Sequence, residues 1–241
     1  QPDIEEIVKL CIKNKAYLID DLVQSPLSEY NSKADFVFNS YRKVLPLAEG
    51  AMLQVNKSNE FNSKNIIKKS FKHLSFVSSR TIAAILKNIS FLKLIWRHLF
   101  IHSEECLIDA YPKPAKMSNL SRYIINRLDF KEIVKIRRMN YNYLLKNLNN
   151  SSIKPLYSIL SSEVCPLGFP VLCENRNKLK EILIENKIYP PIHWNLPVCI
   201  KKEDFSESYN ISNKILTIPV DQRYSVNDMN KIVVILNNVE L

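Results

Sequence analysis

The chain has 241 residues, of which 46% are hydrophobic and 24% charged, a composition typical of a folded globular protein and not of a disordered or fibrous one. Glycine occurs only twice, at Gly50 and Gly168. This excludes a glycine-rich phosphate loop, because such loops need several glycines for close backbone approach. The net charge is +10, which makes a polyanionic partner a possibility to weigh.

The five cysteines are widely spaced, with no C-x-x-C pair and no cysteine beside a histidine in a motif. This pattern indicates free thiols in a reducing compartment and no metal site, so we expect a cytoplasmic protein. No apolar run approaches the roughly 20 residues that span a bilayer, and no signal peptide is present, so we expect no membrane association. The chain begins Gln1-Pro2-Asp3 without a methionine. We therefore expect it to be part of a longer protein.

The first predicted element is an amphipathic helix over 3–14, in which Asp3 is the N-cap and Glu6 completes a capping box. Three short apolar runs follow and are typical of buried strands: 16–19, 35–38 and 51–55. The first of them ends abruptly at Asp20-Asp21. A helix followed by short apolar strands predicts an α/β fold with a parallel or mixed sheet.

From 63 to about 150 the pattern is helical, with loops expected near Ser103 and at 111–118. Its last helix spans 130–148, with five candidate buried positions: Ile133, Ile136, Leu144, Leu145 and Leu148. After that, strands are expected at 156–160, 170–173 and 215–218, and helices at 177–186 and 225–237. Ser225, with Asp228 three residues later, opens the last helix. We expect one domain over 1–125, with a helical middle, and a second, α+β domain over 126–241.

Two side chains in this pattern suggest chemistry. Asp21 lies at the carboxyl end of the first predicted strand, and Lys43 follows the second. Open α/β sheets bind their ligands at that edge. A lysine amine can form a Schiff base with an aldehyde cofactor, and a carboxylate can keep a pyridine nitrogen protonated. On spacing alone, however, Lys43 could be a surface charge and Asp20-Asp21 a turn or a helix cap.

A longer set of segments resembles the pyridoxal-phosphate-dependent DegT/DnrJ/EryC1/StrS aminotransferases. The segments are 18–25 (LIDDLVQS), 38–43 (FNSYRK), 49–51 (EGA), 137–141 (RRMNY), 167–170 (LGFP), 188–194 (IYPPIHW) and 218–224 (IPVDQRY). The resemblance covers nearly the whole chain and is weakest over about 60–110. It implies a fold-type-I α/β architecture, with part of a large α/β/α cofactor-binding domain followed by a small α+β domain.

The resemblance also implies roles for four residues around pyridoxal 5'-phosphate. Lys43 would form the Schiff base with the cofactor and then move a proton between the two reacting carbons. Asp21 would pair with the pyridine nitrogen, and Gln24 would lie against the ring. Ser40 would donate a hydrogen bond to the phosphate. The remaining phosphate contacts of this family would lie before Gln1, so the chain would be the carboxyl-terminal portion of such an enzyme.

On the substrate side, the resemblance assigns His193 and Tyr189 to the pocket. The implied reaction moves an amino group from a donor, with glutamate expected, to a keto-sugar that is usually nucleotide-linked. Such products are used in surface polysaccharide and antibiotic biosynthesis. The family works as a homodimer with the pocket at the interface, so a second subunit is implied.

Two alternatives stay open. A catalytically incompetent fragment or remnant of such an enzyme is favoured if the natural chain begins at Gln1. A basic polyanion-binding module is suggested by charge alone, which is densest at Lys64, Lys68, Lys69, Lys72, Arg80, Lys87, Lys93 and Arg97. Because these residues alternate with apolar ones, they are typical of the solvated side of helices. The lack of interleaved aromatic residues disfavours nucleic acid.

Overall fold

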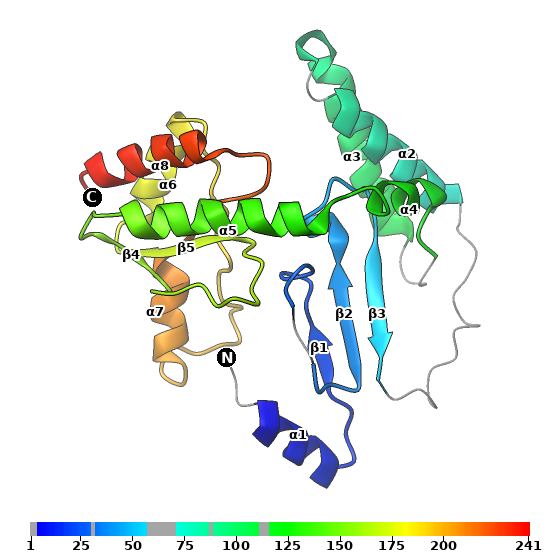
Figure 1. Ribbon diagram of the computed structural model, residues 1–241, viewed down its shortest axis with the longest axis horizontal. Helices are drawn as coiled ribbons and strands as arrows, with labels where there is room; N and C mark the ends of the chain where they lie inside the picture. Colours follow the sequence, from blue (N-terminus) through cyan, green and yellow to red (C-terminus); the bar gives the residue numbers. More distant parts are fainter. Residues whose placement is uncertain (1–3, 30–31, 57–70, 87–88, 111–115) are drawn as a thin grey trace. The chain divides into compact units, whose positions relative to one another are not determined.

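A computed structural model of the chain describes residues 4–29, 32–56, 71–86, 89–110 and 116–241 (Figure 1). The chain forms two compact units. The first comprises Gln1–Pro26 and Asn31–Leu128, and the second comprises Leu27–Tyr30 and Asp129–Leu241. The expected N-cap Asp3 and the expected start of the helical region at 63 lie outside the described residues. Each unit combines helices with a three-stranded sheet, and the chain as described has the predicted α/β fold class.

The first unit contains a three-stranded mixed sheet in the order β1-β2-β3. Its strands are β1 (Ile19–Asp21), β2 (Phe36–Ser40) and β3 (Ala51–Val55). β1 runs parallel to β2, with Ile19 opposite Phe36 and Asp21 opposite Phe38. β3 runs antiparallel to β2. The expectation of a parallel or mixed sheet is therefore confirmed. The strand predicted at 51–55 lies where it was expected, but it is mostly exposed and not buried.

The first strand differs from its prediction. We expected a buried strand over 16–19, but the strand is Ile19–Asp21 and Ile19 is 60% exposed. Helix α1 (Ile4–Lys13) ends just before the apolar run, and Lys15 takes a positive φ of 53°. The residues after Lys15 form the connection between α1 and β1. The backbone N–H of Leu18 donates to the Asp35 carboxylate at 2.8 Å. Pairing with β2, not the apolar run, decides where the strand begins.

Besides α1, the described part of the first unit contains the helices α2 (Phe71–Leu86), α3 (Lys93–Ala110) and α4 (Asn119–Ile125). α2 and α3 lie side by side (Figure 1), and they share a small core of Ala48, Phe76, Val77 and Cys106. The loop expected near Ser103 is wrong, because this residue lies inside α3. Its hydroxyl donates to the carbonyl of Phe100 at 2.6 Å, so the serine is satisfied within the helix.

The second unit packs helices against an antiparallel sheet in the order β4-β5-β6. Its elements are α5 (Phe130–Asn147), β4 (Ile153–Pro155), β5 (Gly168–Cys173), α6 (Arg176–Glu185), α7 (Ser206–Lys214), β6 (Ile215–Pro219) and α8 (Val226–Asn238). The capping box of Ser225 and Asp228 opens α8 as expected. The strand expected at 156–160 is instead β4, because the chain pairs with β5 three residues earlier than predicted.

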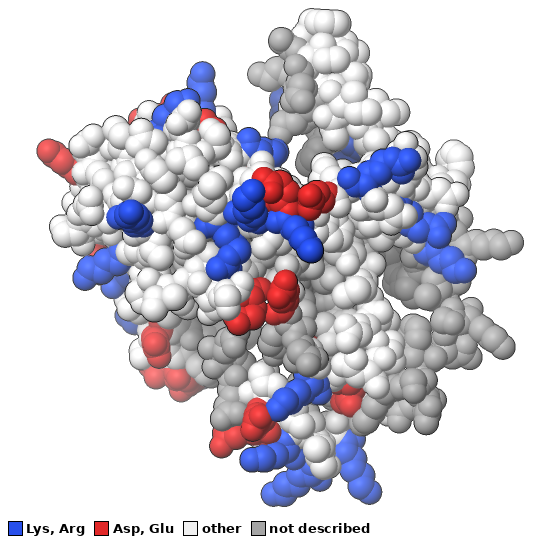
Figure 2. Space-filling model, viewed as in Figure 1, with Lys and Arg blue, Asp and Glu red and all other residues white. Residues whose placement is uncertain are grey.

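Charged side chains of both signs are interspersed on the face drawn in Figure 2. Within the basic block, Arg80 forms an ion pair with Glu104 and its guanidinium lies 4.0 Å from the centre of the Phe100 ring. Lys64, Lys68, Lys69 and Lys87 lie outside the described residues. Among the helices that the structure describes, none is both long and apolar enough to cross a membrane.

Candidate functional site

The fold brings three of the predicted cofactor residues to one edge of the first unit's sheet. Asp21 is the last residue of β1, and Ser40 is the last residue of β2. Because these strands are parallel, both end at the same edge. Lys43 closes a single turn of 3₁₀ helix, η1 (Tyr41–Lys43), that follows β2 directly. Asp21, Ser40 and Lys43 therefore lie at the carboxyl edge, where α/β sheets bind ligands.

Strand register separates the two acids at the end of β1. Side chains opposite each other on neighbouring strands share a face, and successive side chains alternate between faces. Asp21 is opposite Phe38 and therefore shares the face of Ser40, whereas Asp20 is opposite Val37 on the other face. Asp20 accepts a hydrogen bond from the Ser32 hydroxyl at 2.8 Å. Of the pair, Asp21 is thus the one placed toward the face of Ser40.

The carboxylate of Asp21 is exposed, and its Oδ1 accepts a hydrogen bond from the backbone N–H of Val23 at 2.9 Å. This bond forms a turn that carries the chain on to Gln24. The side-chain oxygen Oε1 of Gln24 is buried and has no hydrogen-bond partner among the described residues. An unsatisfied buried oxygen costs about 1–3 kcal/mol, so it is suited to accept from a bound group.

These four side chains fit the chemistry of pyridoxal phosphate. An exposed carboxylate can hold the protonated pyridine nitrogen, and an exposed primary amine can react with the aldehyde. The hydroxyl of Ser40 and the buried, unsatisfied oxygen of Gln24 add hydrogen-bonding capacity. The structure thus groups Asp21, Gln24, Ser40 and Lys43 in one region of the first unit, while the role of each stays a prediction.

The two predicted substrate residues belong to the second unit. Nδ1 of His193 lies 3.1 Å from the Thr217 hydroxyl, and Thr217 is a buried residue of β6. Tyr189 is 69% exposed. His193 is therefore held by the sheet, whereas Tyr189 presents its ring to solvent. Their roles toward a substrate also stay predictions.

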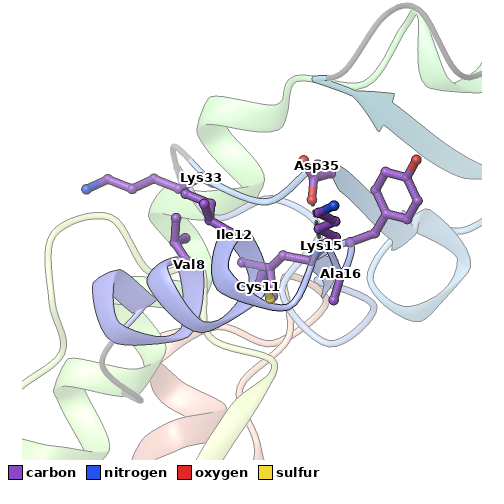
Figure 3. A pocket seen from close by; sticks show the side chains of 9 residues that line it. Val8, Cys11, Ile12, Lys15, Ala16, Lys33 and Asp35 are labelled. Carbon is purple, nitrogen blue, oxygen red and sulfur yellow. Dashed lines mark hydrogen bonds between the residues drawn. The ribbon is translucent and has the colours of Figure 1, made fainter.

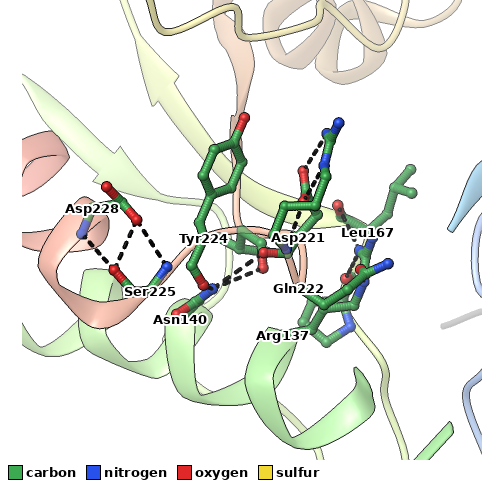
Figure 4. Close-up of polar contacts among 11 residues, drawn as sticks. Arg137, Asn140, Leu167, Asp221, Gln222, Tyr224, Ser225 and Asp228 are labelled. Atoms are coloured by element: carbon green, nitrogen blue, oxygen red, sulfur yellow. Dashed lines mark hydrogen bonds and ion pairs between the residues drawn. The ribbon is translucent and has the colours of Figure 1, made fainter. Parts of the chain in front are cut away.

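A buried polar network in the second unit was missed by the sequence analysis (Figure 4). Arg137 is 3% exposed, and it donates to the Gln222 side chain at 2.7 Å and to the carbonyl of Pro166 at 2.9 Å. Burial lowers the pKa of Arg137. One turn later, Nδ2 of Asn140 donates to the carbonyl of Tyr224 at 2.9 Å. These hydrogen bonds connect α5 to Pro166 and to the loop at 222–224, which lies within the resembling segment 218–224. Their role is structural.

The buried face of α5 accordingly differs from the prediction. Of the five expected positions, Leu144 is buried, as predicted, and Ile133, Ile136, Leu145 and Leu148 are only partly buried. The other buried residues of the helix are Arg137, Asn140 and Tyr141. The spacing of i, i+3, i+4 and i+7 was a usable signal. Two of these residues, Arg137 and Asn140, are polar, so the buried face does not stand out as an apolar stripe.

A cysteine and a histidine also meet, contrary to the sequence analysis. Sγ of Cys106 lies 3.4 Å from Nε2 of His102, which lies 3.2 Å from the Ser75 hydroxyl. The available signal was the separation of four residues on one helix, which places both side chains on the same face. Cys106 is also part of the small core under α2 and α3.

A pocket of about 520 Å³ lies beside α1, away from the candidate residues (Figure 3). Val8, Cys11 and Ile12 of the helix form part of its wall, and Lys15 and Asp35 also line it. Neither Asp21 nor Lys43 lines this pocket. It therefore adds nothing to the candidate cofactor site.

Comparison with solved structures identifies the fold. A DegT/DnrJ/EryC1/StrS aminotransferase from Brucella abortus aligns over 98% of this chain with a TM-score of 0.60 and 13% identity. A putative sugar aminotransferase from Streptococcus pneumoniae, in its PMP form, aligns over 98% with a TM-score of 0.64 and 12% identity. Helicobacter pylori PseC, an aminotransferase of pseudoaminic acid biosynthesis, aligns over 98% with a TM-score of 0.62 and 15% identity.

The chain spans 60%, 66% and 62% of the length of these three structures, respectively. At such identities the likeness shows the fold, which is that of the fold-type-I pyridoxal-phosphate aminotransferases. No protein-family model and no curated protein matches the sequence. The resemblance seen in the sequence motifs and the likeness of the fold thus point to the same group of enzymes.

Proposed function

We propose that this chain belongs to a pyridoxal-phosphate-dependent aminotransferase that acts on a sugar. The observation that carries the proposal is the shared position of Asp21 and Lys43 at the carboxyl edge of two parallel strands. The same chain has the fold of sugar aminotransferases, one of which was solved in both PLP and PMP forms. A carboxylate and a lysine at that edge, in that fold, are the two groups that this chemistry needs.

When bound, pyridoxal phosphate supplies an electron sink for the carbon that loses its proton. The other steps belong to the chain's own side chains. The Lys43 amine would hold the cofactor through a Schiff base and, when free, would move a proton between the two reacting carbons. Asp21 keeps a proton on the pyridine nitrogen. Gln24 and Ser40 orient the ring and the phosphate, and His193 and Tyr189 contact the substrate.

We further propose an amino-acid donor, with glutamate expected, and a nucleotide-linked keto-sugar as the acceptor. The names of two similar structures support this choice: PseC is described as acting in pseudoaminic acid biosynthesis, and DesI was solved with its TDP-sugar product. A role in surface polysaccharide or related biosynthesis, a homodimeric assembly and a cytoplasmic location complete the proposal. The first two rest on the sequence resemblance, and the location rests on the widely spaced cysteines.

The proposal is tested by adding pyridoxal phosphate to the protein and recording the absorbance spectrum. We expect the yellow band of a lysine adduct, and we expect Lys43→Ala to abolish it, because Lys43 carries the amine that follows the parallel strand next to the one ending in Asp21. Lys13→Ala, which removes an exposed lysine at the end of α1, is the matched control and should leave the band unchanged. Absence of the band in the unaltered protein would instead favour a catalytically incompetent fragment.

A further inference from the structure

Glu49 is a buried carboxylate in the segment between η1 and β3, and it is 9% exposed. A carboxylate removed from water is costly unless charged or hydrogen-bonding groups satisfy it. Here both oxygens have partners. Oε1 accepts from the backbone N–H of Ser118 at 2.6 Å, and Oε2 lies 2.5 Å from Nε2 of His73.

The two partners come from separate parts of the first unit. His73 lies in the first turn of α2, and Ser118 is the N-cap of α4, where its hydroxyl accepts from the Ser121 N–H at 3.1 Å. The separations from Glu49 are 24 residues for His73 and 69 residues for Ser118. A single side chain therefore fixes the segment that contains it against two helices.

That segment is joined to the turn that carries Lys43. The backbone N–H of Tyr41, the first residue of η1, donates to the carbonyl of Gly50 at 2.9 Å, one residue after Glu49. Gly50 has a φ of 135°, and a Cβ there would lie 3.2 Å from the Met117 side chain, so the chain is closely fitted at this point. Movement of Glu49 would therefore be passed through Gly50 to the start of η1.

The chain that follows Lys43 is fixed by the burial of apolar side chains. Val44 and Leu45 follow Lys43 directly and are buried, as is Ala48, whereas Lys43 itself is exposed. The backbone of the turn is thus fixed at both ends while the amine is left accessible. This is the arrangement expected of a lysine that must meet a bound group in one orientation.

We propose that Glu49, through its contacts with His73 and Ser118, is a positioning residue that sets the place of Lys43. The inference rests on the proposed role of Lys43 in binding pyridoxal phosphate. Glu49 itself does not touch the cofactor in this account. Its effect is on how fast and how selectively Lys43, compared with other lysines, reacts with the aldehyde.

The experiment measures site-selective labelling. The protein is mixed with pyridoxal phosphate, samples are reduced with borohydride at intervals, and peptide mass spectrometry gives the labelling rate of Lys43 relative to that of exposed Lys13. Glu49→Ala removes both contacts and should lower this ratio on the order of tenfold or more, the cost of a misplaced reacting group. His73→Ala removes one contact and should lower it in the same direction.

The conservative variant Glu49→Gln should restore most of the labelling ratio that Glu49→Ala loses. In Glu49→Gln, the amide oxygen can still accept from Ser118 and the amide nitrogen can still donate to His73, so most of the ratio should be kept. Glu105→Ala is the matched control, because this carboxylate on α3 is 71% exposed. It takes no part in the contacts of Glu49 with His73 and Ser118. Circular dichroism of each variant shows whether it has folded, and if Glu49→Ala has not, the His73→Ala and Glu49→Gln pair decides the test.

The two levels of failure are distinguishable. If the unaltered protein shows no preference for Lys43, the proposed function fails. If it labels Lys43 preferentially and folded Glu49→Ala or His73→Ala does so to the same extent, the positioning role of Glu49 is overturned while the proposed function stands. Equal loss in Glu49→Gln and Glu49→Ala would also contradict it, since the amide keeps both contacts.

Discussion

Asn140 illustrates how much one buried polar side chain can organise. Its Nδ2 faces three backbone carbonyls, of Val220, Asp221 and Tyr224, at 3.3, 3.3 and 2.9 Å. Three acceptors around one nitrogen fix the orientation of the amide, because only its NH₂ group can donate. The residue thereby holds the turn between β6 and α8 against α5.

Asn140→Asp should therefore be strongly destabilising at neutral pH. The substitution replaces a donor by a carboxylate oxygen that faces the same carbonyls, so hydrogen bonds are lost and a charge is buried. We expect a loss of about 3 kcal/mol or more in the free energy of unfolding. Urea denaturation measures it, with Asn142→Asp on the exposed side of the same helix as the control. Equal effects at the two positions would contradict this assignment.

Asp221 makes the stability of the fold depend on pH. Burial would raise the pKa of its carboxyl, but two side-chain hydrogen bonds at 2.8 Å and the charge of Arg223 outweigh burial, so the pKa lies below its usual range. A lowered pKa in the folded state means that the carboxylate stabilises the fold above the ordinary pKa of Asp. That contribution is lost as the pH falls through the folded-state pKa.

Asp221→Asn should accordingly cost about 1 kcal/mol at pH 7, and the difference from the unaltered protein should shrink as the pH falls below about 4. Denaturation midpoints across this range measure the effect. Asp204→Asn, at an exposed carboxyl, serves as the control. A difference that does not change with pH would show that the ion pair with Arg223 adds nothing.

At the scale of elements, the contact between β5 and β6 depends on a glycine. Gly168 opens β5 opposite Pro219, and a Cβ at this position would lie 2.3 Å from Cγ2 of Thr217. Thr217 cannot simply turn away, because its hydroxyl also contacts His193 at 3.1 Å. The close approach of the two strands thus leaves no room for a methyl group.

Gly168→Ala should cost about 1–3 kcal/mol through overpacking. Thr217→Ser removes the clashing methyl group and keeps the hydroxyl, so the same glycine substitution should cost less in that background. A double-mutant cycle of unfolding free energies measures this coupling. The same cost in both backgrounds would show that the crowding lies elsewhere.

The elements also show what the sequence could and could not predict. α8 was predicted closely because its capping box is local, with Ser225 and Asp228 three residues apart. β1 was misplaced because its limits depend on pairing with β2. Helical spacing could have indicated that Arg137 is buried, but not its hydrogen-bond partner, because Gln222 is 85 residues away in the chain. Interactions between distant residues leave no periodic signal in the sequence.

The candidate site likewise contains residues that the sequence could predict and residues that it could not. Asp21, Gln24, Ser40 and Lys43 could be selected from motif resemblance and from the rule that ligands bind at the carboxyl ends of strands. The buried Glu49 also lies in a matching segment, but nothing in the sequence shows that its partners are His73 and Ser118. Their roles become visible only when three distant segments are brought together.

At the scale of the whole molecule, the described parts of the two units differ in their cores. In the second unit a continuous core includes the fully buried Leu144, Phe169, Leu183, Ile218 and Met229. The described core of α2, α3 and Ala48 is much smaller. We expect amide hydrogens of β5, β6 and α8 to exchange more slowly than those of α2 and α3. Mass spectrometry of deuterium uptake measures this, and equal rates would contradict it.

The central proposal is that Lys43 would hold pyridoxal phosphate covalently at the sheet edge where β1 ends in Asp21. The most direct measurement is the peptide map of the unaltered protein after incubation with the cofactor and reduction with borohydride. We expect the added phosphopyridoxyl mass on the peptide containing Lys43, at close to one group per chain. An unlabelled Lys43, or labelling spread evenly over the exposed lysines, would contradict it.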